Sequence, residues 1–82
     1  MTQSDMPTIA REGEYEFMVH TREKEIEPPH VHVFFGDEEV RINLDTGEFM
    51  DEPLAGKRAA IRKAYERHKV KIREAWDKIH RR

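Results

Sequence analysis

Several short segments of this chain alternate apolar and polar residues, the pattern of a half-buried β-strand. The turn signals Glu12-Gly13, Gly36-Asp37 and Asp45-Thr46-Gly47 lie between these segments. The order of strands and short turns predicts an antiparallel meander. The expected strands are residues 8–11, 15–20, 30–35, 39–44 and a short fifth strand at 48–50.

After residue 52 the pattern changes to a helical period, with one apolar stripe about 80° wide. The helix is expected to begin near Pro53 and to end at about Ile79, because no proline or glycine follows Gly56. It is longer than any strand, so its last turns must overhang the sheet, bend near Lys69 or pack on another subunit. The stripe contains Ile61, Tyr65, His68, Ile72, Trp76 and Ile79.

These elements predict an α+β fold: an antiparallel four- to five-stranded meander sheet, covered on one face by a long C-terminal helix. Residues 8–82 are expected to form a single domain, and residues 1–7 a short N-terminal extension. Either Met1 or Met6 is the natural start. A domain of 82 residues has a small core, which favours a homodimer or a small partner protein.

Strand alternation assigns the side chains to two faces of the sheet. The face under the helix should hold Tyr15, Phe17, Val19, Val31, Val33, Phe35, Val40, Ile42 and Leu44. The other face, here called the histidine face, should be uncovered and should hold Glu16, Met18, His20, His30, His32, Phe34, Glu39, Arg41 and Asn43.

The histidine face has four interpretations that the residues leave open. His30 and His32 are suited to general acid and base catalysis, with Arg41 binding a phosphate, as in metal-independent ribonucleases. His20, His30 and His32 are weak candidates for a divalent-metal site. Phe34, with Met18, offers apolar contact to a partner. In the fourth, structural interpretation, His30 and His32 bond to loop carbonyls near Pro28-Pro29.

Composition narrows the function classes. The chain has no cysteine, which removes disulfides, thiol catalysis and thiolate metal sites. The sequence shows no apolar run long enough to span a membrane and no signal-peptide centre, so a cytoplasmic location is expected. No cofactor is predicted.

Charge is divided along the chain. Residues 1–54 hold 4 of the 15 basic and 14 of the 17 acidic residues, a net charge of −10, whereas residues 55–82 carry +8. On the predicted helix, Lys63, Arg67 and Lys71 follow one another at i, i+4 spacing, which is repulsive without an anion. This basic flank would bind RNA or DNA, or be neutralised by acidic residues of the same chain or of a partner. His68, inside the apolar stripe, is expected to be packed and hydrogen-bonded, and His80 to be solvated.

Three features together resemble a known family. They are Met6-Pro7-Thr8-Ile9 near the start, the run Pro28-Pro29-His30-Val31-His32, and a terminal helix that carries Trp76. The chain is similar to the small bacterial proteins of the domain of unknown function 4160 (DUF4160) family. The resemblance implies a prokaryotic cytoplasm and often a neighbouring gene for another small protein, an arrangement like that of toxin–antitoxin pairs. We therefore expect a small interaction module that binds a protein or RNA, with a ribonuclease-like enzyme or a histidine metal site as alternatives.

Overall fold

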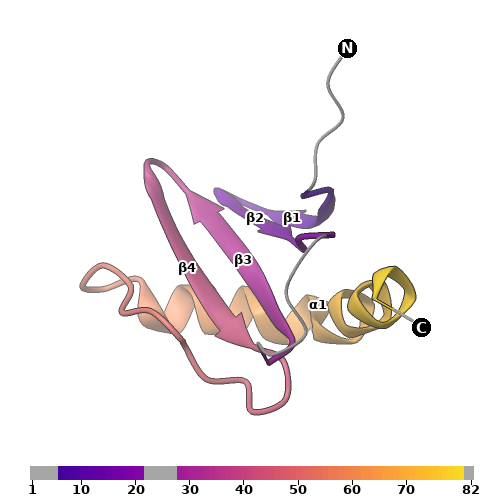
Figure 1. Ribbon diagram of the computed structural model, residues 1–82. Helices are drawn as coiled ribbons and strands as arrows, with labels where there is room; N and C mark the ends of the chain where they lie inside the picture. Colours follow the sequence, from indigo (N-terminus) through magenta and orange to yellow (C-terminus); the bar gives the residue numbers. More distant parts are fainter. Residues whose placement is uncertain (1–5, 22–27, 81–82) are drawn as a thin grey trace.

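The alternating segments form one antiparallel sheet. The computed structural model describes residues 6–21 and 28–80, with strands β1 (Thr8–Glu12), β2 (Tyr15–Met18), β3 (His30–Phe35) and β4 (Glu38–Asn43). The strands lie in sequence order, and α1 (Arg58–Ile79) crosses one face of the sheet (Figure 1). The predicted α+β meander is confirmed. Most of the predicted extension, residues 1–5, lies outside the described residues.

Glycine sets the two hairpin turns. Gly13 and Gly36 have φ angles of 58° and 57°, in the left-handed region that glycine adopts at little cost. Each is the first of the two residues that link the paired strands, the position that a type II′ hairpin turn reserves for glycine. These turns fix the register that pairs Glu12 with Tyr15 and Phe35 with Glu38.

The predicted fifth strand at 48–50 is reduced to a single bridge between Phe49 and Ile42. The Met50 N–H donates to the Arg41 carbonyl at 2.8 Å. The Arg41 N–H, however, donates to Oδ2 of Asp51 at 2.9 Å. A side chain therefore takes the place of the backbone partner that a longer strand would supply, and segment 48–51 covers the outer edge of β4.

The helix begins later than predicted. Gly56 has a φ of 83° and cannot belong to a right-handed helix in that conformation. The Lys57 N–H closes a turn on the Leu54 carbonyl at 3.0 Å, and α1 starts at Arg58. From there it is one helix to Ile79, with no break near Lys69.

The core lies between the helix and the predicted sheet face. Eight of the nine residues assigned to that face are buried, and Leu44 is half-buried against them. The prediction of the apolar stripe on the helix is also largely correct. Ala64 belongs to the stripe as well, and His68 and Ile79 lie at its half-buried margin. The buried residues of α1 are Ile61, Ala64, Tyr65, Ile72 and Trp76.

Candidate functional site

The strand register brings the candidate residues of the histidine face together. His32 lies between Met18 of β2 and Arg41 of β4, and Phe34 lies between Glu16 and Glu39. The Phe34 ring stacks on that of His32, with ring centroids 6.3 Å apart. The histidine face therefore exists as a set of neighbouring side chains, and its chemistry depends on what holds each of them.

His30 is part of the interior of the protein. It is 1 % exposed, and its Nδ1 donates to the Pro28 carbonyl at 2.8 Å. Its ring lies 5.7 Å from that of Trp76 and 5.0 Å from that of His32. The prediction of a wholly uncovered face is wrong here, because α1 extends past the strands and its last turns cover the beginning of β3. The bond to the Pro28 carbonyl is a contact of the kind that the structural interpretation describes.

The end of α1 also corrects the prediction for His80. Its ring centroid lies 3.8 Å from that of Trp76, and its Nε2 donates to the His20 carbonyl at 2.8 Å. His80 is therefore half-buried rather than solvated. The sequence left open whether the last turns of α1 overhang the sheet, bend or pack on another subunit; they pack against their own chain. His20 lies beside His32, with ring centroids 6.4 Å apart.

His32 and Arg41 are each held by a carboxylate. His32 Nδ1 donates to Oε2 of Glu39 at 2.6 Å, and the His32 side chain is 12 % exposed. Arg41 forms a two-pronged pair with Asp51, Nε to Oδ2 at 2.9 Å and Nη2 to Oδ1 at 3.0 Å. Hydrogen bonding from Arg41, followed by its charge, holds the pKa of Asp51 below the usual 3.8. This pair fastens segment 48–51 to β4.

The described residues do not form a cluster of metal ligands. Within residues 6–21 and 28–80, no group of three or more His, Cys, Asp or Glu side chains is placed to hold a metal ion. His20 and His32 are neighbours, but Nδ1 of His32 is bonded to Glu39 and Nδ1 of His30 to Pro28.

The basic flank is divided by an ion pair. Arg67 is paired with Glu12 of β1, and Nε2 of His68 lies 2.9 Å from the same carboxylate. Hydrogen bonding to Arg67 is the largest cause that lowers the pKa of Glu12. His68 is thus packed and hydrogen-bonded as predicted, while the exposed Lys63 and Lys71 are left on either side of a neutralised Arg67.

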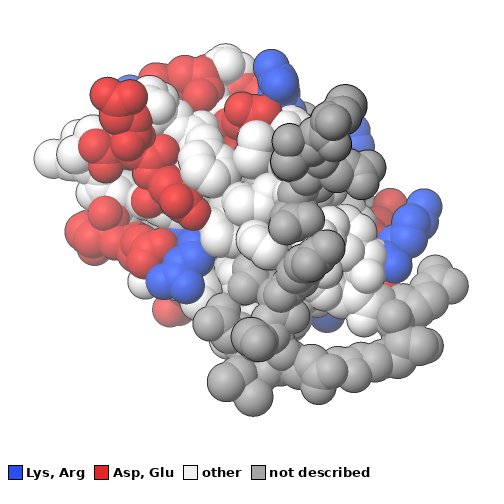
Figure 2. All heavy atoms as spheres, turned by 45° about the horizontal axis from the view of Figure 1, so that its top comes forward, with Lys and Arg blue, Asp and Glu red and all other residues white. Residues whose placement is uncertain are grey.

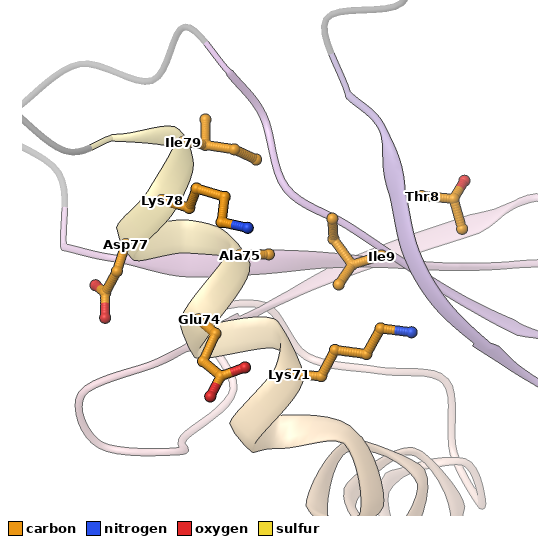
Figure 3. Close-up of a pocket in the computed structure, with 8 residues that line it drawn as sticks. All are labelled: Thr8, Ile9, Lys71, Glu74, Ala75, Asp77, Lys78 and Ile79. Carbon is orange, nitrogen blue, oxygen red and sulfur yellow. The ribbon is translucent and has the colours of Figure 1, made fainter.

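A groove between β1 and the C-terminal half of α1 is a feature that the sequence did not reveal. It has a volume of about 640 Å³. A bulge in the β1–β2 pairing lies between Thr8 and Ala10, and the intervening Ile9 packs toward the core and lines the groove. Lys71 and Lys78 reach from α1 toward β1 (Figure 3). The full lining is Thr8, Ile9, Lys71, Glu74, Ala75, Asp77, Lys78 and Ile79.

Comparison with known proteins identifies the family of this chain. The family described as Domain of unknown function (DUF4160) matches residues 15–77, most of the chain. The chain belongs to the DUF4160 family. No curated protein and no solved structure matches it.

The matched span includes the histidine face and most of α1, but not β1. In this DUF4160 protein, Thr8, Ile9, Lys78 and Ile79 of the groove therefore lie outside the family match. The described part of the chain contains no helix with the length and apolar character needed to cross a membrane.

The exposed end of the β3–β4 hairpin is acidic. Figure 2 shows Asp and Glu gathered toward the end of the β3–β4 hairpin, where Asp37, Glu38 and Glu39 are exposed. A surface of this charge repels nucleic-acid phosphates. Within residues 6–21 and 28–80 of this DUF4160 protein, the Lys and Arg side chains that form no ion pair lie elsewhere, on α1.

Proposed function

We propose that this protein is a small binding module that acts together with a second small protein, as one component of a toxin–antitoxin-like pair in a bacterial cytoplasm. One observation carries the proposal. The candidate catalytic residues His30, His32 and Arg41 are each hydrogen-bonded within the fold, whereas the groove beside β1 is open. The family match itself assigns no activity.

The contacts of Arg41 and His30 weigh against a ribonuclease. A phosphate bound by Arg41 would compete with Asp51, which accepts two hydrogen bonds from the guanidinium and a third from the backbone. His30 is buried and donates to a carbonyl. Of the two candidate catalytic histidines, His32 reaches the surface and His30 does not. A single imidazole with Glu39 supplies one acid–base group where cleavage needs two.

The charge distribution favours a protein over RNA or DNA. Nucleic-acid binding rests on several Lys or Arg residues that contact successive phosphates. Arg67 is neutralised by Glu12, so Lys63 and Lys71 do not form a continuous basic surface. Acidic residues dominate the exposed end of the β3–β4 hairpin (Figure 2). A protein partner that combines apolar and charged contacts suits the groove beside β1 better than a nucleic acid does.

Co-expression with the product of the neighbouring gene tests the proposal. We expect the two proteins to elute as one complex whose mass, measured by light scattering, is the sum of the two. We also expect one protein to arrest growth when expressed alone, and the other to relieve the arrest. His32→Asn should leave the complex intact.

Three results would contradict this function. If each protein elutes alone and neither alters growth, the binding-module proposal is wrong. If the purified protein cleaves RNA and folded His32→Asn loses the cleavage, the ribonuclease alternative replaces it. A homodimer that excludes the second protein would assign the surface to self-association instead.

A further inference from the structure

The groove lies beside the edge of a sheet. β1 is the first strand in the order β1-β2-β3-β4, so β2 is its one neighbour among the described strands. An edge strand directs alternate N–H and C=O groups away from the sheet, where another extended chain can pair with them. The other edge differs, because segment 48–51 already occupies the outer side of β4.

The bulge in β1 gives this edge an apolar floor. Because an extra residue shifts the alternation of side chains, Ile9 and Ala10 both pack toward the core. Ile9 faces Ala75 across the groove, and Ile79 continues the apolar surface at the helix end (Figure 3). The bulge also makes β1 a poor template for indiscriminate strand pairing. Recognition at this edge must therefore come from the groove as well as from the backbone.

The groove lining holds two lysines and two carboxylates, and these differ in direction and pairing. Lys71 and Lys78, which lie two helical turns apart, extend toward β1, whereas Asp77 points to the far side of α1 (Figure 3). Asp77 is paired with Arg73 at 3.3 Å. Within the described chain, neither Lys71 nor Lys78 forms an ion pair. Asp77 shares Arg73 with Asp45, which lies 2.8 Å from the guanidinium. Among the described residues, Glu74 forms no ion pair, so one unpaired carboxylate of the lining stands against two unpaired lysines.

Building on the proposed function, we propose that the groove binds an extended, acidic segment of the partner protein. The segment pairs with the outer edge of β1, places apolar side chains over Ile9 and Ala75, and brings carboxylates to Lys71 and Lys78. Backbone pairing supplies affinity, and the side-chain pockets supply specificity. Charge selects an acidic segment, because a basic one would meet two unpaired ammonium groups.

A peptide titration tests this assignment without the natural partner. The probe is a synthetic peptide that alternates valine and glutamate and is long enough to pair along the five residues of β1. Backbone amide NMR shifts are recorded in low salt up to millimolar peptide. We expect shifts at residues 8–12 and 71–79, and weaker binding as salt is raised.

Charge reversal provides the matched controls. Lys71→Glu with Lys78→Glu should weaken binding of the glutamate peptide by about tenfold, because two attractions become repulsions. The same double variant should bind the corresponding lysine peptide, which the natural protein should not bind. Lys63→Glu with Lys69→Glu makes the same charge change on α1 outside the groove, and this variant should bind the glutamate peptide like the natural protein.

Three outcomes would overturn the assignment: no shifts at millimolar peptide, equal binding of the glutamate and lysine peptides, or shifts confined to the histidine face. An RNA oligonucleotide that displaces the peptide from residues 71–79 at lower concentration would assign the groove to nucleic acid instead. None of these outcomes decides whether the neighbouring protein forms a complex, so this inference and the proposed function fail separately.

Discussion

Replacing Trp76 with alanine should strongly destabilise this fold. The indole is 8 % exposed, and its ring lies 5.7 Å from that of His30 and 3.8 Å from that of His80. Truncating a buried tryptophan to alanine costs about 3–5 kcal/mol, through lost burial and the cavity that remains. A domain of this size is stable by roughly 4–12 kcal/mol. The variant should therefore lose a large part of its stability, and its Tm should fall by at least about 12 °C.

Urea unfolding followed by far-UV circular dichroism measures this loss. Tryptophan fluorescence does not serve, because Trp76 is the single tryptophan of the chain. Trp76→Phe keeps an aromatic ring and should cost less, which gives a measurable value if the alanine variant does not fold. Val70→Ala is the control, because Val70 is 67 % exposed and its truncation should change the free energy of unfolding by less than about 0.5 kcal/mol.

An unchanged unfolding midpoint in Trp76→Ala would refute the packing of the helix end on β3. Light scattering of both proteins before unfolding separates this effect from the loss of a dimer. If the natural protein is monomeric, the whole loss belongs to the contacts of Trp76 within one chain.

Two further substitutions test the histidine face. His30→Leu introduces an apolar side chain of similar bulk and removes the donor to the Pro28 carbonyl. The substitution should therefore lower the free energy of unfolding by about 1–3 kcal/mol, and an unchanged Tm would contradict the structural role of His30. Asp51→Asn tests the pair with Arg41 through pH. Because the pKa of Asp51 lies below 3.8 in the folded protein, its stabilising effect is complete above that value and is lost as the pH falls through the folded pKa. The natural protein should thus be more stable than Asp51→Asn near neutral pH, and urea unfolding should show that the difference shrinks in acid; a difference independent of pH would contradict this.

The strands and the core face could be predicted because alternation depends on neighbouring residues alone. Val31, Val33 and Phe35 are buried as their spacing requires. The helix boundary was wrong because the left-handed conformation of Gly56 ends any helix that starts at Pro53, and no local pattern reports that angle. The fifth strand was overestimated because the Asp51 side chain, rather than a strand, takes the Arg41 N–H.

The candidate site was harder to predict because its contacts join residues far apart in sequence. Arg67 meets Glu12 and His80 meets His20 only when α1 lies across the sheet. The first contact divides the predicted basic flank, and the second covers part of a face that was expected to be open. The groove depends on the β1 bulge that turns Ile9 toward the helix, and an extra residue in a strand leaves no reliable mark in the alternation.

Hydrogen–deuterium exchange of the complex with the neighbouring protein tests the central claim most directly. If this protein is a binding module whose open surface is the groove, the complex should show new amide protection in β1 and in residues 71–79 of α1. The hairpin end around Asp37 and Glu38 should exchange as in the free protein. Protection confined to the histidine face, or an exchange pattern that the second protein does not alter, would contradict the account.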